Sequence, residues 1–227
     1  MRIAVLGTGM VGRAVVGRLA GLGHEVTVGT RDVAATMART EPDSMGNLPY
    51  PAWAAEQFPD VHLATHGEAA ANAELLVNAT AGAVSLTTLE AAGAQNLADK
   101  ILIDIANPLD HSQGFPPSLS IQNTDSLAER IQAAFPRLRV VKTLITMNAH
   151  IMVDPRSLSD GDHSVFVSGN DADAKKVVTG ILESFGHTDV IDLGDITTAR
   201  GAEMMLPMWI RLMGVLGTPA FNFKIVR

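Results

Sequence analysis

The first 32 residues carry the feature that most constrains what this chain can fold into. A short apolar run over residues 2–6 leads into a glycine-rich segment, and an apolar-periodic stretch then continues to residue 22. A second apolar run follows at residues 24–30. Strand, glycine turn, helix and strand in this order predict a βαβ unit with a dinucleotide-binding fingerprint in its turn. The fingerprint reads Gly7-Thr8-Gly9-Met10-Val11-Gly12.

Each glycine of the fingerprint has a separate expected role. Gly7 permits the tight turn out of the strand, Gly9 leaves room for a pyrophosphate against the backbone, and Gly12 lets the helix pack closely on the sheet. The helix N-terminus offers free N–H groups and a partial positive charge to that pyrophosphate. A glycine turn without a ligand is the alternative, but the flanking strand and helix favour binding. All six residues are therefore candidate cofactor contacts.

The end of the second strand indicates which dinucleotide the site prefers. NAD sites usually place Asp or Glu there, where the carboxylate accepts a hydrogen bond from the ribose 2′-hydroxyl. This chain has Gly29, Thr30 and Arg31, so a hydroxyl and a guanidinium are available to a 2′-phosphate. The alternatives are that Arg31 is a solvated surface charge and that Asp32 serves a ribose. The sequence therefore predicts NADP(H).

Composition argues against several classes of function. The 227 residues carry 24 acidic and 17 basic side chains, a net charge of −7, which disfavours nucleic acid and anionic membranes as partners. The chain has no cysteine, which excludes disulfides, a thiolate nucleophile and cysteine-ligated metals, and which fits a cytoplasmic location. The seven histidines lack metal-ligand spacing, so no metal site is expected. No apolar run reaches the length of a membrane span.

Strand-like and helix-like segments alternate along the rest of the chain, which predicts an α/β Rossmann fold with a doubly wound, mostly parallel sheet. Residues 1–150 are expected to form the dinucleotide-binding domain, and residues 151–227 a C-terminal extension that packs on it. Further strands are expected at 61–64, 75–79, 101–105, 140–141, 164–168 and 189–193. Helices are expected at 33–39, 52–58, 68–73, 86–97, 126–135, 171–185 and 199–216.

Small and polar residues follow two of the expected strands. Ligands of open α/β sheets bind outside the carboxyl ends of the strands. Thr80 and Ala81 come after the strand at 75–79, and Asn107 and Pro108 come after the next one. These four residues are therefore candidate dinucleotide contacts.

Two titratable residues lie near the same predicted cleft. Lys142 is interpreted as the solvated end of a strand, with a role as general acid as the alternative. His150 is interpreted as a structural or exposed histidine rather than a catalytic one, because no partner carboxylate can be assigned to it. No catalytic residue is therefore predicted.

Two longer segments have no assigned role. Residues 41–58 resemble an insertion, which either covers the cofactor or decorates the surface. Residues 199–216 form a nearly all-apolar helix that Pro207 should kink. Such a helix must be buried in the core, in a pocket wall or against another subunit, and a homodimer is the favoured assembly.

Several stretches together resemble the family of coenzyme F420-dependent NADP oxidoreductases, small Rossmann enzymes that are similar in turn to the NADPH-binding domain of the STEAP metalloreductases. The matching residues are the fingerprint at 7–12 and the stretches 24–31, 104–108 and 141–149. The strand and helix at 165–185 and the turn at 192–194 match as well. The resemblance covers nearly the whole chain apart from residues 41–58.

The resemblance implies that NADP(H) lies across the carboxyl edge of the sheet. Thr30 and Arg31 would hold the 2′-phosphate, and Ala149 would lie beside the nicotinamide, where the second redox partner stacks. In such enzymes the hydride passes directly between two rings, so the protein positions the rings and excludes water. Ile145 stands where relatives more often carry a polar residue, and no lysine closely follows Arg31. The path to the nicotinamide would be lined by Thr80, Ala81, Asn107, Pro108 and Ala149.

Three functions are compatible with these residues and with the resemblance. The favoured one is an NADP(H)-dependent oxidoreductase that moves a hydride between nicotinamide and a deazaflavin (coenzyme F420) or flavin co-substrate. The second is an NADPH-dependent reductase of a small imine, carbonyl or metal chelate. The third is a non-catalytic NADPH-sensing module that binds a partner through its C-terminal helix.

Overall fold

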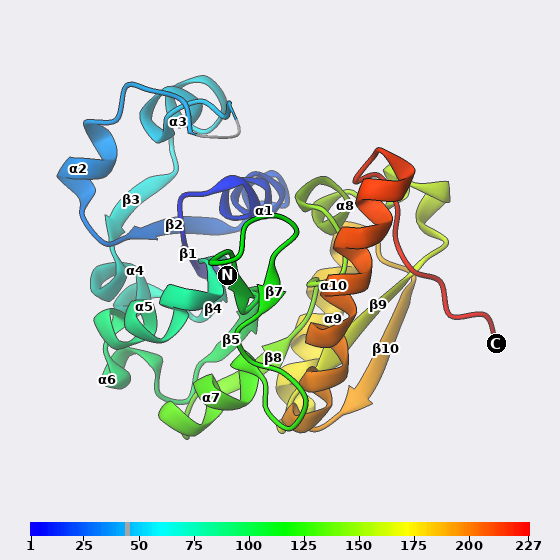
Figure 1. The fold of residues 1–227 in the computed structure, drawn as a ribbon. Coiled ribbons are helices and arrows are strands. Elements are labelled where there is room, and N and C mark those ends of the chain that lie inside the picture. Colours follow the sequence, from blue (N-terminus) through cyan, green and yellow to red (C-terminus); the bar gives the residue numbers. More distant parts are fainter. Residues whose placement is uncertain (44–45) are drawn as a thin grey trace.

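A single eight-stranded sheet organises the protein in the computed structural model, which describes residues 1–43 and 46–227 (Figure 1). The strand order is β10-β9-β8-β5-β4-β1-β2-β3, and neighbouring strands run parallel except at the single antiparallel bridge between β8 and β9. The predicted Rossmann-type α/β fold is therefore confirmed. The strands are β1 (Arg2–Leu6), β2 (Glu25–Thr30), β3 (His62–Thr65), β4 (Leu75–Asn78), β5 (Ile101–Asp104), β8 (Arg139–Lys142), β9 (Ser164–Ser168) and β10 (Asp189–Gly194).

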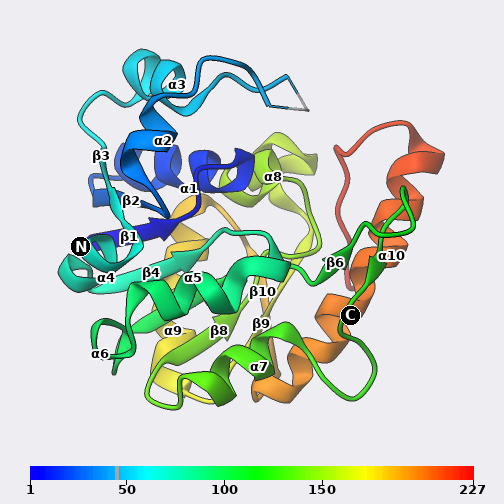
Figure 2. The ribbon, with the colours of Figure 1, turned by 60° about the vertical axis from the view of Figure 1, so that its left-hand side comes forward.

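Helices cover both faces of the sheet, as Figure 2 shows. One apolar cluster joins the sheet to α1, α3, α8 and α9, and a second joins it to α4, α5, α6, α7 and the start of α10. Adjacent residues of β1 alternate between the two clusters, because successive side chains of a strand point to opposite faces. The helices are α1 (Met10–Gly21), α2 (Val33–Met37), α3 (Tyr50–Gln57), α4 (His66–Asn72), α5 (Ser85–Ala92), α6 (Ala94–Leu97), α7 (Leu127–Ala134), α8 (Ala149–Val153), α9 (Ala172–Phe185) and α10 (Ala199–Leu216).

Most elements lie within a few residues of their predicted bounds, and the larger differences have local causes. The helix expected at 86–97 is divided into α5 and α6 by Gly93, whose φ of +88° does not continue a helix. The loop expected at 109–120 contains a short antiparallel ladder between β6 (Leu109–Asp110) and β7 (Ser118–Leu119). Both features are short, and the hydrophobic periodicity of the sequence does not predict them.

The segment at 41–58 packs on α1 rather than standing free in solvent, although residues 44–45 of this segment lie outside the described part. The guanidinium of Arg13 lies 5.4 Å from the ring centre of Trp53 and 5.9 Å from that of Tyr50. Arg13 Nε also donates to the Thr8 carbonyl oxygen over 2.9 Å. Arg13 therefore connects the segment to the fingerprint turn.

The last 29 residues run along one end of the sheet and return to it. The helix α10 buries one side, including Leu206 and Ile210, while Met208 is 59% exposed and Val215 is 83% exposed. The expectation of a buried helix thus holds for one side only, and the homodimer stays a prediction. After α10, the Phe223 carbonyl accepts the N–H of the first residue of β9. Within the described residues, no helix is both long and apolar enough to cross a bilayer.

A buried histidine pair in this C-terminal part predicts how stability depends on pH. Burial lowers the pKa of His187 to about 4; its hydrogen bond to the Met152 carbonyl opposes this shift, and the nearby His163 adds to it. The unfolded chain takes up this proton near pH 6.5, before the folded protein does, so the free energy of unfolding should fall as pH drops from 6.5 to 4. The loss attributable to His187 is roughly 3 kcal/mol.

Urea unfolding at a series of pH values measures this effect. The variant His187→Gln should show a shallower fall over the same range, because its side chain does not titrate. A matched His62→Gln variant, which alters an exposed histidine, should follow the wild type. Equal slopes for wild type and His187→Gln would contradict the assignment.

Candidate dinucleotide site

The fingerprint turn has the close contacts that its glycines predict. Gly7 has a φ of +124°, and a Cβ there would lie 2.6 Å from the Ala79 carbonyl oxygen. A Cβ on Gly12 would lie 2.3 Å from the Gly7 carbonyl oxygen. A Cβ on Gly9, by contrast, would meet nothing within 4 Å. The fold itself therefore requires Gly7 and Gly12, whereas the space beside Gly9 remains available to a ligand.

The N-terminus of α1 is left open for an anion. Gly9 is its N-cap and offers no side chain to the free N–H groups of the first turn, which also contains no acidic residue. By contrast, α2, α4, α7, α8 and α9 each begin with a side chain that accepts a hydrogen bond from the first turn. Uncapped N–H groups and the helix dipole together suit the pyrophosphate of a dinucleotide.

Two glycine variants should separate folding from binding. Gly9→Ala should fold, with a free energy of unfolding within about 1 kcal/mol of wild type, yet bind NADPH and NADH at least about tenfold more weakly because the methyl group occupies the pyrophosphate position. Gly12→Ala should destabilise the fold itself, because its methyl group overlaps a backbone carbonyl. Urea unfolding and ligand titration measure the two effects. Unchanged affinity in Gly9→Ala would show that the pyrophosphate lies elsewhere.

A cavity of about 250 Å³ lies at the carboxyl ends of β1 and β2. It brings together five of the predicted contact residues, and none of the residues that line it is acidic. Thr30 is 7% exposed and its hydroxyl shares a hydrogen bond of 2.8 Å with the Thr36 hydroxyl. The Asp32 carboxylate accepts the Ala35 N–H and caps α2. The lining residues are Gly7, Thr8, Gly29, Thr30, Arg31, His66, Thr80, Val84, Thr87, Thr88 and Ala91.

The loops after β4 and β5 touch each other at the same edge. The Gly82 N–H donates to the Asn107 carbonyl oxygen over 3.2 Å, and a Cβ on Gly82 would lie 2.1 Å from that oxygen. The Thr80 hydroxyl donates to Asn78 Oδ1 over 2.7 Å. Asn107 Oδ1 is buried and has no hydrogen-bond partner within the described part. An orphaned acceptor beside the predicted cofactor path suits a donor on a ligand.

A buried ion cluster lies below these loops. Lys142 is 1% exposed, and its ammonium lies 2.9 Å from Asp104 and 3.0 Å from Glu203. It also donates to the Ala106 carbonyl oxygen. Burial by itself would lower the pKa of Lys142, but the two carboxylates outweigh burial and raise it. The interpretation of Lys142 as a solvated strand end is therefore wrong, because the residue is sealed inside the protein and bound to Glu203 of α10.

The backbone that leaves β8 is strained where it passes this cluster. Leu144 is 3% exposed and has a φ of +62°, a left-handed conformation that costs a leucine about 1–3 kcal/mol. Its neighbour Thr143 has a buried hydroxyl without a hydrogen-bond partner in the described part. Strained residues of this kind cluster at ligand sites.

Of the remaining candidates, Ala149 lies near the fingerprint helix α1. Ala149 is the first residue of α8, which contacts α1. Together with Met10 and the exposed His150, it lines a cavity of about 620 Å³ between α1, α8 and the end of α3. Ala81, by contrast, is exposed and precedes the turn at 82–84. Asn107 and Pro108 do not line the cavity beside Ala149, and the contact of these three residues with a nicotinamide stays a prediction.

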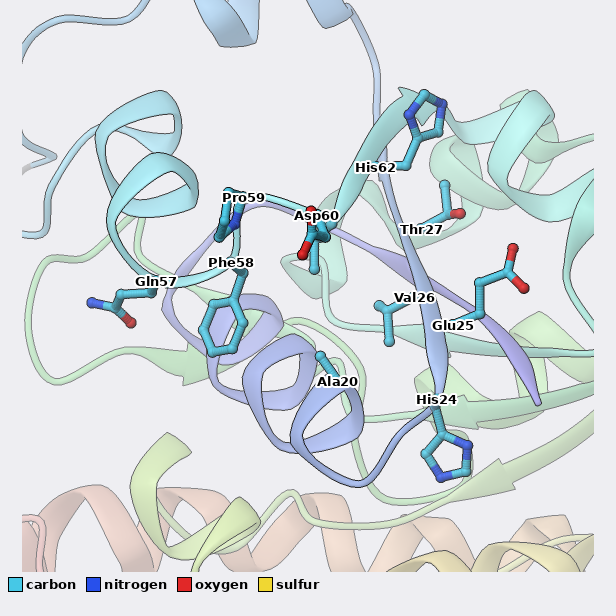
Figure 3. A pocket seen from close by; sticks show the side chains of 11 residues that line it. Ala20, His24, Glu25, Val26, Thr27, Gln57, Phe58, Pro59, Asp60 and His62 are labelled. Atoms are coloured by element: carbon cyan, nitrogen blue, oxygen red, sulfur yellow. The ribbon is translucent and has the colours of Figure 1, made fainter.

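A further cavity, of about 410 Å³, lies at the opposite edge of the sheet, where β2 and β3 begin (Figure 3). His24 and Glu25 line one side of it, and Phe58 and Asp60 line the other. Because ligands of open α/β sheets bind at the carboxyl ends of the strands, this cavity is not the dinucleotide site. The described residues contain no group of three or more His, Asp or Glu side chains placed to hold a metal ion.

Sequence reasoning missed two features of the site. His66 follows β3 at the carboxyl edge, but the sequence pattern predicts a strand that ends at residue 64 and a helix that begins at 68, which leaves His66 in a loop. The Lys142–Asp104 pair joins the last residues of adjacent strands β5 and β8. The rule that ligands bind at the carboxyl edge would have pointed to His66, and knowledge of the strand order would have pointed to Lys142.

Comparison with known proteins agrees with this geometry. The family model described as NADP oxidoreductase coenzyme F420-dependent matches residues 2–108. A crystal structure from Arthrobacter sp. FB24, provisionally described as an F420-dependent NADP-reductase, is 64% identical, with a TM-score of 0.95 and complete coverage of both chains. The protein belongs to the coenzyme F420-dependent NADP oxidoreductase family.

Two curated proteins are similar to this chain over nearly its whole length. The F420-dependent NADP reductase of Methanothermobacter thermautotrophicus is 28% identical over 216 residues, which cover 93% of this chain and 89% of that one. The metalloreductase STEAP3 of Rattus norvegicus is 27% identical over 213 residues, which cover 92% of this chain. The chain spans 38% of the length of that metalloreductase. The resemblance inferred from the sequence motifs is thereby confirmed.

Proposed function

We propose that this NADP-dependent oxidoreductase transfers a hydride between nicotinamide and a deazaflavin or flavin ring. The observation that carries the proposal is the cavity at the carboxyl edge, which joins the fingerprint turn to Thr30 and Arg31 and has no acidic residue in its lining. A carboxylate there would repel a 2′-phosphate, whereas a guanidinium can pair with it bidentately.

The residues that would hold NADP(H) form a path along this edge. Thr30 and Arg31 would bind the 2′-phosphate, and the N-terminus of α1 would bind the pyrophosphate. The loops at Thr80–Ala81 and Asn107–Pro108 would then guide the ligand toward Ala149. When bound, the nicotinamide supplies the hydride, and the protein supplies orientation.

The segment after α10 lies beside the start of α8. Asn148 Nδ2 donates to the Pro219 carbonyl oxygen over 2.6 Å, which brings the segment after α10 beside the first turn of α8. Trp209 and Phe221 stack in this C-terminal part with ring centres 5.2 Å apart. We infer that α10 and its following segment form a wall of the acceptor site.

Ring-to-ring transfer also fits the chemistry of the nearby groups. Reduction of an imine or a carbonyl needs a proton donor at the reacting atom. Of the two titratable candidates from the sequence, Lys142 is enclosed and engaged by two carboxylates and a carbonyl oxygen, and His150 is exposed. Direct hydride transfer between two rings needs no such donor, because positioning and exclusion of water suffice.

An acceptor screen tests the proposal. NADPH oxidation is followed by its near-ultraviolet absorbance with coenzyme F420, FMN, and a panel of small imines and carbonyls at equal concentrations. We expect F420 or FMN to support a rate at least about tenfold above that of any small substrate. Faster turnover of an imine or carbonyl would favour a small-molecule reductase instead, and tight NADPH binding without any turnover would favour a sensing module.

A further inference from the structure

A histidine lies in the same cavity as Arg31. His66 is the first residue of α4, directly after β3, and it lines the 250 Å³ cavity together with Thr30 and Thr80. Its side chain is nearly enclosed, because the residue is only 7% exposed. Neither the fingerprint nor the proposed binding of the 2′-phosphate by Thr30 and Arg31 assigns a role to this residue.

One ring nitrogen of His66 is unpartnered. Nδ1 is buried and has no hydrogen-bond partner within the described part of the chain. It packs over Gly29, where an added Cβ would lie 3.0 Å away. A ring nitrogen without a hydrogen-bond partner can take up a proton without breaking an existing hydrogen bond.

The charges around His66 are one-sided. Arg31 is the only other titratable residue that lines the cavity within the described part of the chain. The groups that Gly29 faces on this side of β2, Leu6 and Ala69, are apolar. Glu68 of α4 is engaged by Thr65, whose N–H and hydroxyl both donate to it.

The surroundings of the ring therefore disfavour its protonated form in the absence of a ligand. Burial lowers the pKa of His66, and the Arg31 charge lowers it further. A phosphate dianion in the cavity would reverse the sign of the local field, and the protonated form of the ring would then be favoured.

We propose that His66 is a specificity residue of the cofactor site, which takes up a proton and pairs with the 2′-phosphate when NADP(H) binds beside Arg31. The inference rests on the proposed use of NADP(H), and it adds a second, pH-dependent cation to the site. Affinity for NADP⁺ should therefore rise as pH falls from about 8 to about 6, while affinity for NAD⁺, which lacks this phosphate, should not.

Calorimetric titration with NADP⁺ and NAD⁺ tests this inference. Measurements at about pH 6 and pH 8, each in two buffers of different ionisation enthalpy, give the affinity and the number of protons taken up. His66→Gln keeps a donor near Nε2 but does not titrate. It should take up fewer protons than wild type with NADP⁺, and should bind NADP⁺ about five- to tenfold more weakly at the lower pH and within about twofold at the higher pH. The proton equilibrium of the 2′-phosphate is common to both proteins and cancels in the comparison.

The controls separate this inference from the proposed function. His62→Gln, which alters an exposed histidine at the start of β3, should match wild type in proton uptake. An NMR titration of the His66 ring in wild type, free and with NADP⁺, should show a higher pKa in the complex and requires no variant to fold. Equal proton uptake by wild type and His66→Gln, or an unchanged ring pKa, would overturn the role of His66 while NADP⁺ binding stands. Failure of wild type to bind NADP⁺ would overturn the proposed function itself, and the inference with it.

Discussion

Replacing Lys142 with methionine is expected to lower the free energy of unfolding by about 3–5 kcal/mol. The substitution keeps the length of the side chain but leaves Asp104 and Glu203 buried without their shared cation. Glu203 keeps the N–H groups of Leu127 and Ala128, which donate to it over 2.9 and 3.2 Å, but these bonds do not neutralise its charge. Urea unfolding followed by circular dichroism measures the loss.

A matched lysine variant and a double variant identify the cause of that loss. Lys224 pairs with Asp162 over 2.7 Å and lies 3.8 Å from Asp189, but its own side chain is 38% exposed, so Lys224→Met should change stability by at most about 1 kcal/mol. Adding Glu203→Gln to Lys142→Met should recover part of the loss, because one uncompensated charge is removed. A loss below about 1 kcal/mol in Lys142→Met would show that the cluster does not stabilise the fold.

Replacing Arg31 with alanine should weaken NADPH binding about 10- to 150-fold, the range expected from losing a charged hydrogen bond of about 1.5–3 kcal/mol. NADH has no 2′-phosphate, so its affinity should change by less than about threefold. The variant should therefore lose its preference for NADPH because its affinity for NADPH falls, while its affinity for NADH stays nearly unchanged. Fluorescence titration with each dinucleotide measures both affinities.

A control variant that removes the same charge elsewhere distinguishes a local role of Arg31 from a general effect of net charge on dinucleotide binding. Lys176→Ala on α9 removes one exposed positive charge on another part of the molecule, so both affinities should stay at wild-type values. An equal loss of NADPH and NADH affinity in Arg31→Ala would place Arg31 at the pyrophosphate or the ribose rather than at the 2′-phosphate.

The sequence predicted the strands and the glycine turn of the first βαβ unit well, because these features depend on local patterns. Three local conditions meet in the first βαβ unit: a strand-like apolar run at 2–6, glycines at 7–12 that permit a tight turn, and a helix that packs closely on the strand. Few other folds require all three together. The helix at 199–216 has the predicted bounds for a similar reason, since its run of apolar residues is long.

The misses arise where the decisive contacts join distant residues. Lys142 has the sequence context of an exposed strand end, and only the strand order and the position of α10 bring two carboxylates to it. His66 was missed because β3 ends one residue later than its pattern predicts. The left-handed Leu144 has no local signal, since the surrounding packing imposes its conformation.

The carboxyl edge of this sheet, with its open helix N-terminus and its guanidinium at Arg31, is the proposed site of the phosphorylated pyridine dinucleotide. Titration of the purified wild-type protein with NADPH and with NADH, at one pH and one salt concentration, tests this assignment most directly. We expect NADPH to bind at least about tenfold more tightly than NADH. Equal affinities, tighter binding of NADH, or no binding of either dinucleotide would contradict it.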